Sequence, residues 1–174
     1  MDQLVDMRAG HFISAASLSN LPHGGNKVPC FGDNGIRGYV DRKTHSGDYV
    51  LIGRQGALCG NVHRIEGDFY ATEHAVVAKP RDGVNKDWLF HFLTKMNLNQ
   101  YATKSAQPGL SVERISRLVV PLPSVGEQVK TARTLDSFDS LITNLSAGLP
   151  AELNARRQQY EYYRDRLLTF EEAA

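Results

Sequence analysis

Two closely spaced prolines, Pro121 and Pro123, divide this 174-residue chain into two parts with different hydrophobic periodicities. Proline fixes φ and removes a backbone donor, and it disfavours helix at the residue before it, so the segment "VVPLPSV" at 119–125 is expected to be extended. Before this segment apolar residues occur in short strand-like runs, whereas after it they recur every three or four residues, as on a helix. We therefore expect an α+β fold class, with a β-rich domain over residues 1–123 and a long-helix region over residues 124–174.

The first part is predicted to consist mostly of short strands and tight turns. Turn signals at 34–35, 46–48, 55–56 and 66–68 separate its β-rich runs, which are "GYVDR", "DYVLIGR", "NVHRI", "FYATE" and "HAVVAKP". One helix is predicted within 85–102, where apolar residues recur at helical spacing: Trp88, Leu89, Phe92, Leu93 and Met96. A second, short helix is predicted to begin at Ser111, which can cap its first turn.

The region after Pro123 is predicted to form two consecutive helices. Ser124 and Glu127 have the spacing of a capping box, so the first helix should begin there. Gly148 and Pro150 in "AGLP" are typical of a helix end followed by a new start, which places a break at 147–150. The second helix, about 21 residues and therefore about 30 Å long, carries a heptad-like seam: Leu149, Leu153, Arg156, Tyr160, Tyr163, Leu167 and Phe170.

This seam predicts pairing with another long helix, and dimerisation or partner binding is its expected use. The same seam could instead fold back on the first part of the chain, because tertiary packing can recruit any amphipathic helix face.

Charge and composition exclude some classes of protein. The chain holds 20 Lys and Arg residues against 19 Asp and Glu, a balance that does not fit a strongly acidic DNA mimic. No apolar run approaches the roughly 18 residues of a membrane span, and the N-terminus lacks the pattern of a secretory signal. Two cysteines, Cys30 and Cys59, are too few for a disulfide framework. We expect a cytoplasmic protein that does not contact membranes.

The sequence carries none of the usual motifs for cofactor binding or hydrolysis. It lacks a G-x-x-x-x-G-K-[ST] phosphate loop, a G-x-G-x-x-G fingerprint, a G-x-S-x-G elbow and an adenine-methyltransferase motif of the Asn/Asp-Pro-Pro-Tyr/Phe type. One alternative is a metal-dependent enzyme with zinc bound by Cys59, His63, Glu73 and His74. Adjacent residues on a strand point to opposite faces, which disfavours convergence of Glu73 and His74. The prediction is a non-catalytic protein with no catalytic residue, metal or cofactor.

Arginine and amide side chains concentrate at the predicted turns and indicate contact with nucleic acid. Guanidinium forks and carboxamides on rigid loops are the groups that hydrogen-bond base edges and phosphates. A second polar loop, "YATKSAQPGLSVER", adds further groups of this kind. The predicted contacts with double-stranded DNA are Asn34, Arg37, Arg42, Arg54, Gln55, Asn61, Lys104 and Gln107. Any one of them can equally be a solvated side chain at a hairpin tip.

Several segments, in this order, resemble the specificity subunit of type I restriction–modification enzymes. They are "PCFGDNGIRGYVDR", "LIGRQGALCGNV", "ATEHAVV", "LNQYA", "AQPGLSVERI" and "VPLP" followed by "EQ", and the tail "GLPAELNARRQQYEYYRDRLLTF" is similar to that family's conserved helical region. The resemblance implies a target recognition domain that reads DNA. It also implies a helical region that docks an adenine methylation (M) subunit and, through it, a restriction (R) subunit, while the chain itself catalyses nothing.

A typical member of that family has two recognition domains and two helical regions, whereas this sequence has one of each. Two copies could pair their tails antiparallel about a two-fold axis. We expect a homodimer that reads two inverted half-sites about one helical turn of DNA, roughly 34 Å, apart. The alternative is an assembly or interaction protein, such as a truncated subunit that competes for the methylation partner without reading DNA.

Overall fold

The structure is a computed structural model that describes residues 1–25, 27–104 and 107–168, without the side chains of 146, 147, 151, 153, 160 and 164–168. Its contacts divide the chain into two compact units, Met1–Ala132 and Arg133–Ala174. The first unit is called the body, and the described part of the second unit is called the rod.

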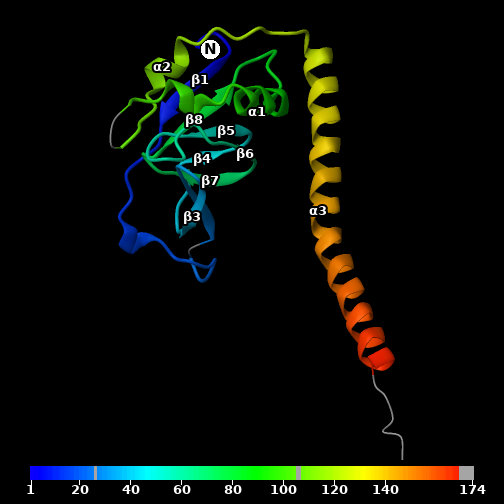
Figure 1. The fold of residues 1–174 in the computed structure, drawn as a ribbon. Helices are drawn as coiled ribbons and strands as arrows, with labels where there is room; N and C mark the ends of the chain where they lie inside the picture. The colour runs from blue at the N-terminus through cyan, green and yellow to red at the C-terminus, as the bar shows by residue number, and fades with distance from the viewer. Residues whose placement is uncertain (26, 105–106, 169–174) are drawn as a thin grey trace, which may run out of the picture. The chain divides into compact units, whose positions relative to one another are not determined.

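The body contains two four-stranded sheets (Figure 1). The first sheet is antiparallel and has the order β1-β8-β5-β6, with the bounds β1 Val5–Ala9, β8 Ala75–Pro80, β5 Tyr49–Gly53 and β6 Val62–Ile65. The second sheet has the order β3-β2-β7-β4, and its bounds are β3 Gly35–Val40, β2 Val28–Gly32, β7 Asp68–Ala71 and β4 His45–Ser46. Strands β2 and β7 run parallel, and the other pairs of this sheet are antiparallel.

Strand β5 shows how the two sheets and one helix share the core. Val50 and Ile52 pack with the apolar side of helix α1, which spans Lys86–Lys95. Leu51 lies between them in sequence and packs with Phe31 and Phe69 of the second sheet. Because successive strand side chains point to opposite faces, the continuous apolar run of β5 lines two clusters of the core at once.

The helices predicted within the body are confirmed. Helix α1 is capped by Asn85, whose side chain accepts a 2.8 Å hydrogen bond from the Trp88 N–H, and it is followed by the 3₁₀ helix η2, Leu98–Tyr101. Helix α2, Val112–Ser116, begins after Ser111, whose hydroxyl accepts from the Arg114 N–H at 3.2 Å. A further 3₁₀ helix, η1, spans Ala15–Ser17.

The five predicted strand runs are confirmed as β3, β5, β6, β7 and β8, but three strands were missed. β1 alternates apolar and polar residues over Val5–Ala9, a signal that was overlooked, and β4 is only the two residues His45–Ser46; both pair over long range, with β8 and β7 respectively. β2 contains Pro29, which normally argues against a central strand. Here Pro29 lies opposite Tyr39, whose own N–H and C=O are bonded to Ser19, so the missing N–H of Pro29 leaves no ladder bond unmade.

Helix α3, Val125–Leu168, begins in the body with the predicted capping box. The Ser124 hydroxyl donates to the Glu127 carboxylate at 2.8 Å, the Ser124 N–H donates to the same carboxylate at 3.0 Å, and the Glu127 N–H reaches the hydroxyl at 3.4 Å. These bonds to the ionised carboxylate lower the pKa of Glu127. The start of the helix is therefore fixed by local sequence.

The side chain of Gln128 fastens the first turn of α3 to the body. It is fully buried, and its Oε1 atom accepts from the Asn85 N–H at 2.8 Å. Its Nε2 atom donates to the carbonyls of Gly83 at 3.0 Å and Pro123 at 2.9 Å. A buried amide group raises the free energy of the folded state unless it is hydrogen-bonded. The three bonds satisfy the amide of Gln128 and explain why glutamine suits this position.

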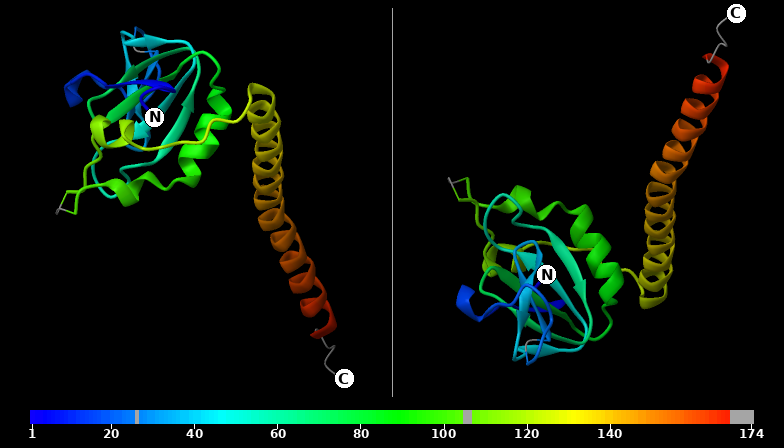
Figure 2. Two further views of the ribbon diagram at one scale, coloured as in Figure 1. Left: turned by 90° about the horizontal axis from the view of Figure 1, so that it is seen from above. Right: turned by 90° about the horizontal axis from the view of Figure 1, so that it is seen from below.

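The predicted helix break at 147–150 is wrong, because α3 is one helix of 44 residues with Pro150 inside it. The ribbon runs through this point without a break (Figure 2). Gly148 does not take the positive φ that ends a helix, and Pro150 has a φ suited to helix and removes a single hydrogen-bond donor. The flanking residues include good helix formers that sustain the helix on both sides. The rod is therefore longer than the 21-residue helix that was predicted.

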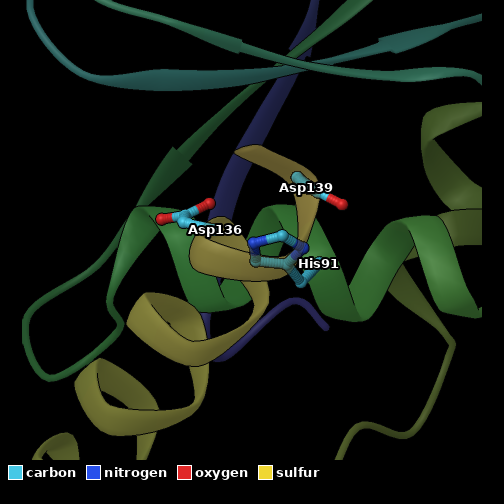
Figure 3. A group of neighbouring side chains, drawn as sticks. All are labelled: His91, Asp136 and Asp139. Carbon is cyan, nitrogen blue, oxygen red and sulfur yellow. The ribbon is translucent and has the colours of Figure 1, made fainter. Parts of the chain in front are cut away.

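Asp136 and Asp139 lie three residues apart on α3, so they project from neighbouring positions of the same helix, whereas His91 belongs to α1 of the body (Figure 3).

Across the described ranges, no helix combines the length and apolar content needed to cross a membrane. The strands followed by a long helix confirm the predicted α+β class.

Candidate nucleic-acid interface

Four segments that are distant in sequence meet at one end of the body. They are the β2–β3 turn (33–34), the β5–β6 loop (54–61), the β7–β8 turn (72–74) and the described residues of 103–110; together they are called the loop edge. Asn61 donates from Nδ2 to Oδ1 of Asn34 at 2.8 Å. Backbone bonds join Arg54 N–H to the His74 carbonyl at 2.8 Å and Gly56 N–H to the Pro108 carbonyl at 3.0 Å.

Two glycines allow the β5–β6 loop and the end of β5 to approach other backbone segments closely. A Cβ added at Gly53 would lie 2.2 Å from the carbonyl oxygen of Asp33. At Gly60 φ is +94°, and an added Cβ would lie 2.5 Å from the backbone nitrogen of Asn99. Only glycine avoids both the steric overlap and the strained backbone. The glycines of the stretch 53–60 therefore permit close contact between backbone segments.

Arg54 is held in place at the centre of the loop edge. Its Nη1 atom donates to the Glu73 carbonyl at 3.2 Å, and its own carbonyl accepts from the Leu110 N–H at 2.8 Å. Its Nε atom is buried and makes no hydrogen bond with any described residue. The first bond holds the guanidinium and the second holds the main chain of Arg54, so the side chain has lost conformational freedom before any ligand arrives, which favours tight recognition.

A second arginine lies beside the first. Arg114 donates from Nη1 to the Tyr101 carbonyl at 3.0 Å, and it lines a hollow of about 200 Å³ together with Arg54, Gln55 and Ser111. Two arginines at one hollow suit a phosphate or the acceptor-rich edge of guanine. Sequence reasoning missed Arg114 because it stood inside a predicted helix, although its place directly after a polar loop was visible.

The predicted DNA contacts do not all lie at the loop edge. Asn34, Arg54, Gln55, Asn61, Lys104 and Gln107 belong to its segments. Arg37 is exposed on β3, and its Cδ lies 2.4 Å from where a Cβ of Gly32 would be, so its stem covers the strand end beside the β2–β3 turn. Arg42 lies past the opposite end of β3, with its guanidinium carbon 6.0 Å from the Tyr70 ring centroid. Arg42 is therefore separated from the others by the length of the strand.

In the described part of the chain, the four residues of the zinc alternative are not arranged as a metal site. No three of Cys59, His63, Glu73 and His74 bring ligand atoms within 4.8 Å of one another. Cys59 is buried with its Sγ 3.4 Å from Nδ2 of Asn99. For the other cysteine, burial raises the pKa of the Cys30 thiol to about 11, so it is not a thiolate near neutral pH.

The predicted partner-binding seam of α3 is only partly described. Leu149, Arg156 and Tyr163 are exposed on the rod. Phe170 and the side chains of Leu153, Tyr160 and Leu167 lie outside the described residues. The rod also carries an apolar stripe that runs along α3 up to Leu149, where the seam begins. Each residue of this stripe is more than half exposed: Phe138, Leu141, Ile142, Leu145 and Leu149.

The family model for the type I restriction modification DNA specificity domain matches residues 10–155, which span most of the body and more than half of the rod. The chain belongs to this family. As a type I specificity domain, it combines a strand-rich body with a long helix in the order that the sequence resemblance implied.

Curated relatives of this specificity domain are longer proteins. The chain is 53% identical over 146 residues to the "Type I restriction enzyme EcoprrI specificity subunit" of Escherichia coli, covering 84% of this chain and 36% of the relative. It is 32% identical over 161 residues to a putative type I restriction enzyme specificity subunit of Haemophilus influenzae, covering 88% of this chain and 42% of the relative. The chain thus spans less than half the length of these two relatives.

Solved structures share the fold. The type I restriction-modification S subunit of M. genitalium superposes with a TM-score of 0.69 at 17% identity, over 98% of this chain and 45% of that one. The HsdS subunit of Thermoanaerobacter tengcongensis superposes with a TM-score of 0.62 at 18% identity, over 83% of this chain and 37% of that one. At these identities the likeness establishes the fold of this specificity domain and not its individual contacts.

Proposed function

We propose that this specificity domain reads one half-site of double-stranded DNA through its loop edge and directs an adenine methylation subunit to that site. The observation that carries the proposal is the convergence of arginine and amide side chains on four loops, within a chain of the type I specificity family. Such groups on a rigid support are the ones that hydrogen-bond base edges and phosphates.

The chemical groups that the loop edge carries suit recognition of DNA. Arg54 and Arg114 can hold phosphate or guanine, while Gln55 offers the paired donor and acceptor of a carboxamide, which matches adenine. None of these contacts performs a reaction. We propose that the chain supplies recognition, that the methylation subunit supplies the chemistry, and that a restriction subunit joins through it.

We further propose that the rod pairs with a second copy of this chain. Leucines, Ile142 and Phe138 recur along the stripe at intervals of three and four residues, which is the spacing of helices that pack lengthwise. Exposing such a stripe is unfavourable by about 25 cal/mol for each Å² of apolar area left in water. The relatives are more than twice as long as the matched region, and a second copy of this chain would supply a second body and a second rod.

The length of α3 changes the expected half-site separation. Its 44 residues span about 66 Å at about 1.5 Å per residue, rather than the 30 Å predicted from a broken helix. In an antiparallel pair the distance between the two bodies depends on how far the helices overlap. The stripe at 138–149 lies nearer the start of the helix than the seam at 149–170, so pairing through the stripe gives the shorter separation.

A binding experiment tests the reading role. The full chain and its methylation partner are mixed, and fluorescence anisotropy compares the target duplex with a scrambled duplex of equal length and composition. The proposal predicts tighter binding to the target by at least tenfold, and a loss of this preference when Arg54 and Gln55 are both changed to alanine. Equal affinity for the two duplexes would contradict it and would favour the assembly-protein alternative.

Light scattering tests the pairing role. The chain of 19.3 kDa is expected to run at twice that mass at micromolar concentration. Phe138→Asp with Leu145→Asp should give the single-chain mass, because charges would enter the helix contact. Ser140→Asp with Asn144→Asp is the matched control on exposed polar positions of the same helix and should remain a dimer. A wild-type chain of single mass would contradict the homodimer.

A further inference from the structure

A second polar recess adjoins the loop edge, where β6 begins and α1 ends. Its volume is about 290 Å³, and Gly60 and Val62 complete a lining whose polar members are Asn61, His63, Thr94, Asn97 and Asn99. This recess is called the amide cleft. We propose that the amide cleft binds the major-groove edge of one adenine of the half-site. This inference rests on the proposed function, since it assumes that the neighbouring loop edge contacts DNA.

The amide cleft has no charged lining residue, which sets it apart from the two-arginine hollow. A phosphate requires cationic side chains or a group of backbone N–H donors, and the polar lining here consists of carboxamides, a hydroxyl and an imidazole. Burial lowers the pKa of His63 from its ordinary value of 6.5, so the imidazole is neutral at physiological pH. A neutral cleft beside a cationic edge suits a base rather than the backbone of the duplex.

Asn99 offers a hydrogen-bond acceptor whose identity is fixed by the protein. Its Nδ2 atom donates to the Cys59 carbonyl at 2.9 Å. A carbonyl oxygen can only accept, so the amide nitrogen must be the atom that faces it, and the alternative flip is excluded. Oδ1 of Asn99 makes no hydrogen bond with any residue that the structure describes. This oxygen is therefore available for the N6 amino group of adenine.

Asn97 supplies the complementary donor. Its backbone has φ +47° and ψ +67°, a left-handed conformation, and its side chain caps no helix and bonds no described residue. Its amide is thus free to donate to N7 of adenine. Asparagine is also one of the residues that tolerate this backbone conformation, along with glycine. Helix α1 ends at Lys95, and the partial negative charge at a helix C-terminus favours an incoming amino group.

This arrangement discriminates against the other bases. Guanine presents the O6 acceptor where adenine has its N6 amino group, so it would place two acceptors against each other at Oδ1 of Asn99. Cytosine has an amino group but lacks the N7 acceptor beside it, and thymine presents a carbonyl and a methyl group. The cleft therefore selects adenine at one position and leaves the other positions to the loop edge.

The decisive variant is Asn97→Gly, because glycine keeps the left-handed backbone and removes only the side chain. The matched control is Asn20→Gly, an exposed asparagine next to Ser19, whose backbone pairs with Tyr39 at the far end of β3 from Asn34. Each protein is used as the full chain with its methylation partner. Binding is measured to the target duplex and to duplexes in which one adenine at a time is replaced by 7-deazaadenine, which lacks the N7 acceptor.

For the wild-type and control proteins, one 7-deazaadenine position should weaken binding by ~10- to 100-fold, the range expected for a specific bidentate base contact. The Asn97→Gly variant should show no added loss at that position and should also accept guanine there. If the variant keeps the wild-type pattern of losses, the amide cleft does not read adenine and the proposed function stands. If the wild type does not distinguish target from scrambled duplex, both the cleft assignment and the proposed function fail.

Discussion

Asn61 and Asn34 are joined by a 2.8 Å hydrogen bond from the Nδ2 atom of the first to the Oδ1 atom of the second, and this contact links the β5–β6 loop to the β2–β3 turn. The two residues were predicted to contact DNA as separate positions on separate turns. Their bond makes them one surface, in which a change to either residue releases the side chain of the other. Mutations of Asn34 and Asn61 should therefore have non-additive effects on DNA binding by the loop edge.

Two arginines that look equivalent in sequence should differ in their effect on DNA binding. Arg37→Ala removes an exposed guanidinium beside the loop edge and is expected to reduce the preference for the target duplex by about 1–3 kcal/mol if it contacts a base. Arg42→Ala is the matched control at the opposite end of β3 and should leave the preference unchanged. Competition binding with target and scrambled duplexes measures both. A loss with Arg42→Ala alone would place the DNA at the other end of the body.

Gln128→Ala should destabilise the body by about 2–4 kcal/mol, because it leaves the partly buried Asn85 N–H and two carbonyls without their partners. The free energy of unfolding is measured from urea denaturation. Gln159→Ala, on an exposed turn of α3, serves as control and should change it by less than about 0.5 kcal/mol. Equal stabilities of the two variants would show that Gln128 does not fasten the helix to the body.

The body should lose stability as the pH falls below 6.5. Burial lowers the pKa of His63 from 6.5, and burial followed by the charge of His11 lowers that of His45. Between the lowered and the ordinary pKa the unfolded chain binds more protons than the folded chain, so the free energy of unfolding decreases with falling pH and levels off below the folded pKa.

Denaturation at several pH values between 7.5 and 5 measures this slope. His63→Leu should reduce it, and His23→Gln, at an exposed position, should leave it as in the wild type. A slope in His63→Leu as steep as in the wild-type protein would exclude His63 as its source.

Pro150→Ala should stabilise α3, because a proline inside a helix costs about 3 kcal/mol relative to alanine. The expected results are a higher ellipticity at 222 nm and a higher melting temperature of the helix. Pro80→Ala, at the end of β8, is a control that should not change the helical signal. A drop in helicity in Pro150→Ala would show that the proline begins a separate helix, as the sequence had suggested.

Local signals in the sequence predicted the parts of this fold that depend on near neighbours. The Ser124–Glu127 capping box and the Ser111 cap were visible because each depends on residues three positions apart. The break at Pro150 was predicted wrongly, since glycine and proline permit a helix end without requiring one, and residues on both sides sustain the helix.

The loop edge could be predicted only as a set of residues and not as a surface. Its assembly depends on contacts such as Gly53 against the Asp33 carbonyl and Gly56 against Pro108, which join positions up to 52 residues apart. Nothing in the local pattern around Arg42 indicated that it would lie away from the others. Likewise, Arg114 and Asn97 stood in or after predicted helices, and only the folded chain places them beside the polar loops.

The measurement that most directly tests the reading of DNA by the loop edge is motif-resolved sequencing of adenine methylation in cells. Cells would carry the methylation partner alone, or with the wild-type chain, with Arg54→Ala and Gln55→Ala combined, or with Arg42→Ala. The proposed function predicts a methylated motif of two inverted half-sites that requires the chain, changes or disappears with the combined variant, and persists with Arg42→Ala. The same motif in cells without the chain, or an unaltered motif with the combined variant, would contradict it.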